Sequence, residues 1–93
     1  MKRDELKPYL AREVDEWSAK PYATLRDELH QVYNAEREAG FEYHVEVDLL
    51  EDRDEYLHVC VSVCSPQVRW SCYHPLTTSF LVYRDGRVDK PVL

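Results

Sequence analysis

The side chains of this sequence best able to do chemistry are three cysteines and four histidines, and several of them occur at alternate positions. His58 and Cys60 are separated by one residue, and so are Cys72 and His74. Alternate residues of a β-strand point to the same face of a sheet, so each pair would share a face. This spacing raises two hypotheses, a transition-metal site and a cysteine nucleophile.

The metal hypothesis is a Zn²⁺ site formed by some of five nitrogen and sulfur ligands: His44, His58, Cys60, Cys72 and His74. Zinc sites usually contain closely spaced ligand pairs, and the sequence has no Cys-x2-Cys or His-x3-His pair. Cys60 and Cys64 would lie about 13 Å apart along one strand, which is too far to share an ion. We therefore expect no cofactor and keep a metal site as the alternative.

A cysteine nucleophile needs a neighbouring base or an environment that lowers its pKa. The nucleophile would be Cys60 or Cys72, and its base would be His58 or His74, oriented by Asp48 or Glu46. No glycine-lined turn near a cysteine is available to stabilise an oxyanion, and residues in the middle of a strand lack the loop environment of most catalytic sites. The sequence therefore favours a protein that is not an enzyme, with a thiol-dependent site at Cys60 and His58 as the alternative.

Cysteine number and hydropathy indicate the compartment. An odd number of cysteines without an export signal favours free thiols over a disulfide framework. No apolar run approaches the roughly 18 residues of a membrane span, and the start, Met1 to Glu5, is charged. We expect a cytoplasmic protein with no membrane contact.

The net charge of −6 argues against nucleic acid as a partner, because phosphate binding needs clustered Lys and Arg. The acidity is uneven, since residues 42–55 contain seven acids and one arginine. A solvated face with a charged turn is the simpler interpretation, and a hairpin that contacts a basic partner is the alternative.

An apolar stripe predicts a first helix between residues 4 and 18: Leu6, Leu10, Val14 and Trp17. Charged residues, Glu13 among them, surround this stripe and should face solvent. Pro8 fits best in a first helical turn, so the ordered helix should begin near Lys7.

A second helix is predicted from about residue 22 to residue 39. Its apolar stripe contains four residues: Leu25, Leu29, Val32 and Tyr33. Thr24 and Asp27 resemble a capping box at its start, and Gly40 stands where a left-handed residue would end it.

From Phe41 the apolar period changes from about 3.6 to 2, which predicts strands over residues 41–49 and 56–64 joined by a polar turn. A register centred on Arg53 keeps both apolar faces together. It places three pairs side by side: Asp48 with His58, Glu46 with Cys60, and His44 with Ser62.

Two further strand candidates are residues 70–73 and 80–83, followed by the turn signal Asp85-Gly86 and a short extended tail. The fold class is α+β: two N-terminal helices packed on one face of a three- to four-stranded, mainly antiparallel sheet. Nothing divides the chain, so residues 1–93 should form a single domain.

Aromatic residues that the core does not explain indicate a contact surface: Tyr56, Trp70, Tyr73 and Tyr83. The predicted binding residues are Tyr56, His58, Trp70 and Tyr73, on the sheet face away from the helices. The most economical function is a non-catalytic interaction module that uses this face or a strand edge to bind a protein partner or a second copy of itself.

Short motifs spread over most of the chain resemble a group of small uncharacterised bacterial proteins of about this length. They are Glu16-Trp17-Ser18, Lys20-Pro21-Tyr22, Pro75-Leu76-Thr77, Ser79-Phe80 and Asp85-Gly86. The resemblance implies an α+β fold and a bacterial cytosol, and it supplies no catalytic residue. The chain departs from the group in having residues 66–70, Pro-Gln-Val-Arg-Trp, instead of a glycine-rich turn.

Overall fold

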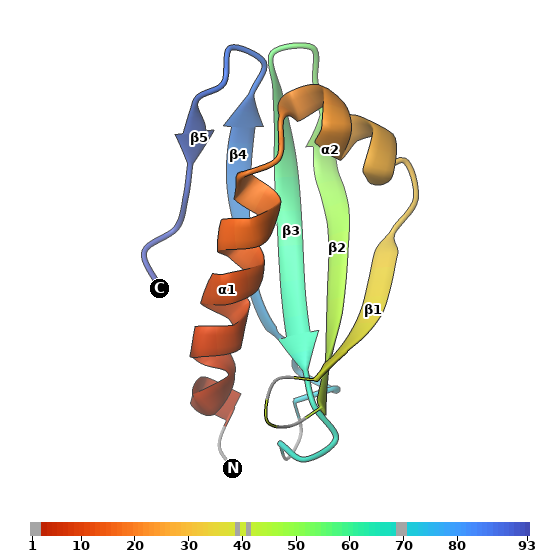
Figure 1. The fold of residues 1–93 in the computed structure, drawn as a ribbon, viewed down its shortest axis with the longest axis vertical. Coiled ribbons are helices and arrows are strands. Elements are labelled where there is room, and N and C mark those ends of the chain that lie inside the picture. Colours follow the sequence, from red (N-terminus) through yellow and green to blue (C-terminus); the bar gives the residue numbers. More distant parts are fainter. Residues whose placement is uncertain (1–2, 39, 41, 69–70) are drawn as a thin grey trace.

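The computed structural model describes residues 3–38, 40, 42–68 and 71–93 and contains helices followed by an antiparallel sheet (Figure 1). The elements are a 3-10 helix at Arg3–Leu6, α1 at Lys7–Ser18, α2 at Tyr22–Glu28, β1 at Tyr33–Glu38, β2 at Glu42–Asp52, β3 at Tyr56–Cys64, β4 at Leu76–Tyr83 and β5 at Val88–Asp89. The five strands pair in chain order, each antiparallel to the next. The α+β prediction is confirmed, and the predicted strand count was too low.

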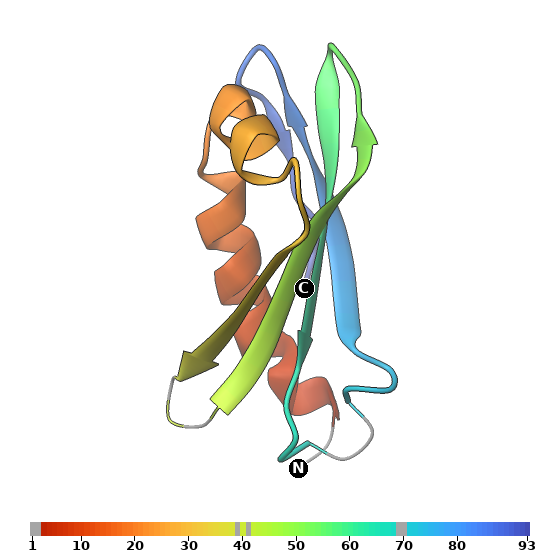
Figure 2. The same cartoon turned by 90° about the vertical axis from the view of Figure 1, so that its right-hand side faces the viewer.

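Both helices cover one face of the sheet and leave the other face open (Figure 2). The core lies between the two layers and is formed mainly by alternate residues of β2, β3 and β4: Tyr43, Val45, Val47, Leu57, Val59, Val61, Val63, Phe80 and Val82. The helices contribute Leu10, Val14 and Leu25 among others. No helix in the described part of the chain is long and apolar enough to cross a membrane.

Helix α1 follows its predicted pattern. It begins at Lys7, and Pro8 lies in its first turn, where a missing N–H costs no helical hydrogen bond. Leu10, Val14 and Trp17 are buried against the sheet. The helix packs on β3 and β4, the central and fourth strands of the sheet.

The predicted second helix was too long. Helix α2 ends at Glu28, and the remaining residues turn and form β1. Tyr33 and Ala35 both face the helices, and this strand pairs with β2 along its whole length. Asn-Ala-Glu-Arg-Glu contains good helix formers, so pairing with β2 overrides local preference here. Gly40 does have a left-handed φ of 89°, but it serves the turn between β1 and β2.

The predicted register of the β2–β3 hairpin was also wrong, by two residues. His44 lies opposite Cys64, Asp48 opposite Cys60, and a bulge between Leu49 and Glu51 shifts the pairing beyond it. The bulge places one more residue on β2 than the symmetric turn assumed. Up to Leu49 the error is two residues, an even number, so the side chains there keep their predicted faces. Beyond the bulge the error is three residues, and Glu51 comes to lie opposite His58 on the open face.

The later strands differ from the prediction in extent. Strand β4 begins at Leu76, four residues before the predicted start. The candidate strand at residues 70–73 is not formed over residues 71–73, which make a turn. Trp70 lies outside the described residues.

Candidate functional site

The open face of the sheet is built by the strand residues that alternate with the core, and it divides into two parts. The acidic half comes from β1 and β2: Asn34, Glu36, Glu38, Glu42, His44, Glu46 and Asp48. The neutral half comes from β3 and β4: Tyr56, His58, Cys60, Ser62, Thr77, Ser79, Leu81 and Tyr83.

The acidic half carries five carboxylates and no Lys or Arg among the described residues. Glu38 lies directly opposite Glu42, an arrangement of like charges that destabilises a strand pair. His44 is the one basic side chain that the described residues place in this half, with Nδ1 2.7 Å from Glu36 Oε1 and Nε2 3.0 Å from Asn34 Oδ1. Within the described ranges, neither Glu38, Glu42 nor Glu46 has an ion pair. The surface therefore projects negative charge that the described residues leave largely unneutralised.

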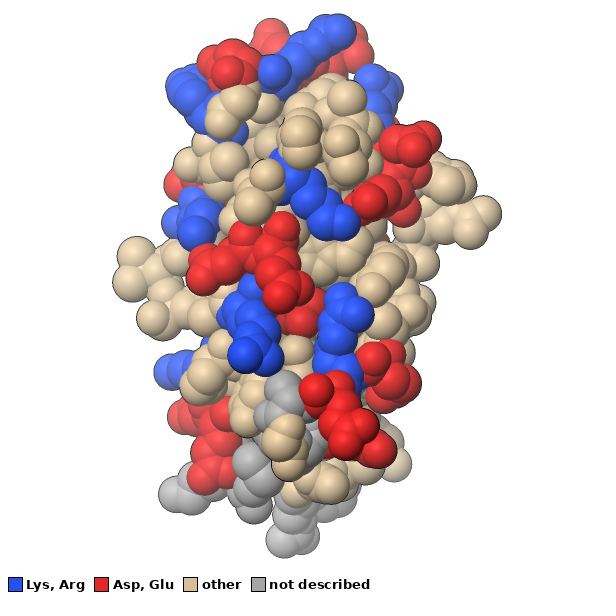
Figure 3. Space-filling view, viewed as in Figure 1, with Lys and Arg blue, Asp and Glu red and all other residues tan. Residues whose placement is uncertain are grey.

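The helical side of the molecule is organised differently, with acidic and basic side chains intermixed (Figure 3). Lys20 Nζ lies 2.6 Å from Glu28 Oε2. Lys90, from the segment after β5, lies 2.7 Å from Asp15 on α1. Neighbouring opposite charges largely cancel the field on this side.

The aromatic end of the neutral half is held by hydrogen bonds. The Tyr56 hydroxyl donates to Glu51 Oε2 at 3.0 Å, which lowers the pKa of the Glu51 carboxyl and raises the pKa of Tyr56. The Tyr56 and Tyr83 rings lie 6.1 Å apart, and the Arg87 guanidinium lies 4.5 Å from the centre of the Tyr83 ring. Two tyrosine rings thus stand side by side on β3 and β4.

His58 joins this group through its neighbours on both strands. Its Nε2 lies 2.9 Å from Ser79 Oγ, and its Nδ1 lies 3.7 Å from Glu51 Oε1. Further along, the hydroxyls of Ser62 and Thr77 form a cross-strand hydrogen bond of 2.9 Å. These contacts fix the polar side chains across β3 and β4 as a surface network.

Cys60 is the one free cysteine among the described residues, and it is half-buried. Burial raises the pKa of its thiol, and the negative charge of Asp48 opposite raises it further. A raised pKa keeps the sulfur protonated at neutral pH, whereas a nucleophile needs the thiolate. The environment of Cys60 therefore opposes the thiol-dependent alternative.

Cys64 and Cys72 form a disulfide, which corrects the expectation of three free thiols. Their Cα atoms lie 5.0 Å apart, within the usual range. Buried serines tie the same segment together: Ser71 Oγ donates to the Ser65 carbonyl at 2.7 Å and accepts from the Ser65 N–H at 2.9 Å. This pairing could not be predicted from the sequence. The turn that brings the two sulfur atoms together is held by the hydrogen bonds of Ser65 and Ser71, which the sequence does not reveal.

The disulfide removes Cys72 from the ligands of the metal hypothesis. In the part of the chain that the structure describes, no group of three or more His, Cys, Asp or Glu side chains could hold a metal ion. His74 is exposed and lies just before the start of β4, which pairs with the end of β3 away from His58.

The predicted binding residues are only partly brought together. Tyr56 and His58 share the neutral half at one end of β3. Tyr73, 79% exposed, lies beyond the other end of that strand, which is roughly 26 Å long. Trp70 is among the residues that the structure does not describe.

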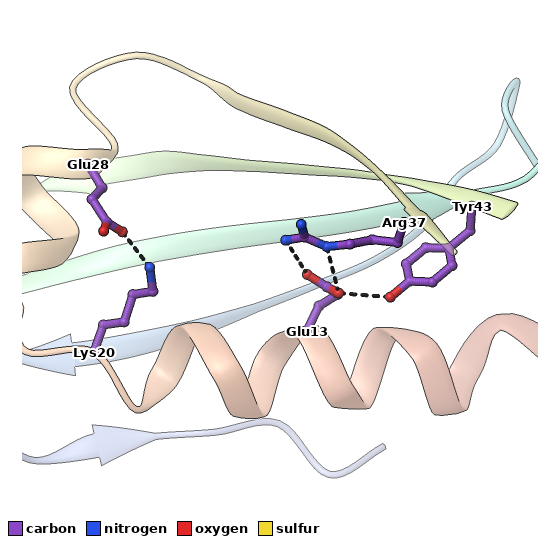
Figure 4. Close-up of polar contacts among 5 residues, drawn as sticks. All are labelled: Glu13, Lys20, Glu28, Arg37 and Tyr43. Atoms are coloured by element: carbon purple, nitrogen blue, oxygen red, sulfur yellow. Dashed lines mark hydrogen bonds and ion pairs between the residues drawn. The ribbon is translucent and has the colours of Figure 1, made fainter. Parts of the chain in front are cut away.

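Sequence reasoning missed a buried polar cluster on the covered face (Figure 4). Glu13 on α1 is only 1% exposed, and its Oε2 accepts a 2.8 Å hydrogen bond from the Tyr43 hydroxyl. Arg37 on β1 contacts the same carboxylate at 3.3 and 3.4 Å. Burial and the Glu13 carboxylate raise the pKa of Tyr43 to about 12. Burial opposes the charge of Arg37, but Glu13 and Tyr33 outweigh it and raise its pKa.

Glu13 could have been recognised from its spacing. It lies three residues after Leu10 and four before Trp17, positions that belong to the buried stripe of α1. A charged residue on a buried stripe requires a partner in the facing layer. Arg37 and Tyr43 are those partners, from the strand that the sequence reading had placed in a helix and from the strand beside it.

Two helices on one face of a five-stranded antiparallel meander define a two-layer α+β domain with one uncovered sheet face. No protein-family model matches this chain, and no curated protein or solved structure shows significant similarity to it.

Proposed function

We propose that this chain is a non-catalytic interaction module that binds a protein partner with a basic surface through the open face of its sheet. One observation carries the proposal: five carboxylates share the acidic half with no Lys or Arg among the described residues. The opposite side of the same chain mixes both charges.

Electrostatics favours a cationic partner at this surface. Side chains directly opposite each other in a sheet lie about 5 Å apart, so the ionised groups of Glu38 and Glu42 repel. A partner's Lys or Arg would relieve that repulsion, and complementary charge accelerates association and rejects wrong partners. Two acidic halves would repel each other, which disfavours a face-to-face dimer. Phosphates would be repelled as well, so nucleic acid is not proposed.

The neutral half would supply the uncharged part of the contact. Tyr56 and Tyr83 present large rings with few rotatable bonds, held by Glu51 and Arg87. His58 and Ser79 offer polar groups beside them. Interfaces commonly combine such aromatic area with a charged rim.

We place this interaction in a bacterial cytoplasm, as the sequence resemblance implies. The disulfide gives a way to test the compartment, because a reducing cytosol would keep Cys64 and Cys72 as thiols. Alkylation in acid-quenched cells should then label three cysteines. Labelling of Cys60 alone would show an oxidising environment and overturn the cytoplasmic assignment.

Site-specific photo-crosslinking in the native host tests the proposal. A photoreactive residue at Ser62, in the middle of the open face, should crosslink to one protein whose contact surface is basic. The same residue at Ala23, exposed on α2, should not. Glu46→Lys should abolish the Ser62 crosslink, whereas Glu5→Lys, exposed on the 3-10 helix, should leave it intact. Equal crosslinking from both positions, or no effect of Glu46→Lys, would overturn the proposal.

A further inference from the structure

Strand β1 forms an open edge of the sheet. It pairs with β2 on one side, and no strand of the described part of the chain lies on its other side. Figure 2 looks onto this edge, and no element crosses in front of β1. The backbone N–H and C=O groups that point away from β2 have no strand partner, and such groups can receive a further strand.

We propose that the partner adds an extended segment to β1 as a sixth strand, with basic side chains at alternate positions. This inference rests on the proposed function, because the acidic half supplies the charge for both. It adds the mode of binding and the sequence pattern of the partner. Strand addition obtains affinity from backbone hydrogen bonds and specificity from alternate side chains.

The residues of β1 on the open face determine where the partner strand needs basic side chains. Asn34, Glu36 and Glu38 point to this side, and side chains of an added strand would stand about 5 Å from them. Glu36 shares its charge with His44 only, and Glu38 faces Glu42. Lys or Arg opposite Glu36 and Glu38 would pair with carboxylates that have no Lys or Arg partner among the described residues.

The covered side of β1 determines the partner residue that stands opposite Ala35, next to the basic residue opposite Glu36. An open cleft of about 350 Å³ lies there, lined by Glu16, Trp17, Lys20, Glu28, Tyr33 and Arg37. A side chain opposite Ala35 would enter between Tyr33 and Arg37, where the small methyl group leaves space.

The cleft suits an apolar or aromatic side chain. Both of its cations already have carboxylate partners, Lys20 with Glu28 and Arg37 with the buried Glu13 (Figure 4). Besides Glu16, the lining also contains the edge-to-face pair of Trp17 and Tyr33, with ring centres 4.8 Å apart. Each ring is also contacted by one of the cations, since Lys20 lies 4.4 Å from the Trp17 ring centre and the Arg37 guanidinium 5.6 Å from that of Tyr33. Aromatic pairs of this kind accept a third ring or an aliphatic group by further edge and face contacts.

A second copy of this chain fits the edge less well. Pairing of β1 with another β1 would add two acidic strands, and each copy carries a net charge of −6. Charge complementarity therefore favours a basic segment. A dimer held by β1 is an outcome that the experiment below distinguishes.

Titration of the ¹⁵N-labelled full chain with two peptides tests the inference. The first is acetyl-Lys-Thr-Lys-Phe-Lys-Thr-Lys-amide, which alternates as the edge requires. The second has the same residues with the four lysines contiguous, so its net charge is identical. The alternating peptide should bind at least about fivefold more tightly, and amide hydrogen exchange in β1 should slow at least about tenfold.

Single substitutions distinguish binding at the β1 edge from general electrostatic attraction to an acidic protein. Glu36→Gln and Glu38→Gln should each weaken binding of the alternating peptide by about threefold, as expected for an exposed ion pair. Glu5→Gln, which removes an equal charge on the 3-10 helix that packs beside β4, should have no effect. The unchanged spectrum of residues in the core shows that each variant is folded.

The failures of the two proposals are distinguishable. Equal binding of both peptides with unchanged exchange in β1 would overturn the edge inference and leave a basic partner for the open face. Binding of neither peptide at roughly 1 mM would also overturn the edge inference, while the crosslinking experiment tests the proposed function independently. Slow amide hydrogen exchange of β1 in a peptide-free dimer would show that a second copy of the chain occupies the edge. That result would also overturn the edge inference.

Discussion

The two faces of the sheet differ in whether their charged side chains have partners of opposite charge. On the covered face, Glu13 is buried and has partners on two strands, Arg37 and Tyr43. On the open face, Glu38 and Glu46 are exposed and, among the described residues, have no cation. Charge that stabilises a fold has a partner within it, and charge without an internal partner is available to another molecule. The difference separates residues that hold the fold from residues free to bind.

The largest expected effect contrasts neighbours on β4. Phe80 points into the core and Leu81 to the open face. Phe80→Ala should lower the free energy of unfolding by about 3–5 kcal/mol, because it leaves a cavity, and Leu81→Ala by about 1 kcal/mol. Urea denaturation measures both. Similar losses would mean that the open face is covered, as in an assembly.

The next largest effect on stability is expected at Glu13, the buried carboxylate of the covered face. Glu13→Ala should destabilise the chain by about 3 kcal/mol, because Arg37 and the Tyr43 hydroxyl lose their acceptor. Glu46→Ala on the open face should change the free energy of unfolding by less than about 0.5 kcal/mol. Equal effects in chemical denaturation would contradict the contrast drawn between the faces.

Alkaline pH should destabilise the chain through Tyr43, which is buried on the covered face. The pKa of Tyr43 is about 12, above its ordinary value of 10, so the folded state holds this proton more tightly than the unfolded chain. The resulting stabilisation, about 2–3 kcal/mol, is complete below pH 10 and is lost as the pH rises towards 12. Stability measured from pH 9 to 12 should therefore fall more steeply in the wild type than in Tyr43→Phe. Parallel curves would exclude this origin.

The smallest expected effect is the change in stability when one carboxylate is removed, and its sign should differ between the open face and the helical side. Glu38→Gln should stabilise the chain by about 0.3 kcal/mol, because it removes the repulsion with Glu42. Glu28→Gln should destabilise it by a similar amount, because it breaks the ion pair with Lys20. Thermal unfolding at low salt resolves the signs, and the same sign for both would remove the electrostatic distinction.

Much of this contrast could be predicted from the sequence. Strict alternation predicted the faces of residues 42–49 and 56–64 correctly, while Phe41 lies outside the described residues. It did so despite a wrong register, because up to the bulge the true pairing differs from the predicted one by two residues, an even number. The bulge near Leu50 has no sequence signature that would have given the register itself.

Strand β1 could not be predicted, and its absence hid the rest of the site. Asn-Ala-Glu-Arg-Glu favours a helix locally, and only pairing with β2 makes it a strand. Without β1, Arg37 had no reason to meet Glu13, and Glu36 and Glu38 did not join the acidic half. The disulfide was missed for a similar reason, because Cys64 and Cys72 meet only through a turn that tertiary contacts define.

The order of the elements also has a consequence for biosynthesis. Each strand pairs with its chain neighbour, so the sheet can assemble from local hairpins, which generally favours rapid folding. Helix α1 is the exception, because it is synthesised first and packs on β3 and β4, which follow more than 35 residues later. Until those strands emerge from the ribosome, Leu10, Val14 and Trp17 have no core to enter. Chaperone capture of the nascent chain should therefore be strongest before β4 is translated.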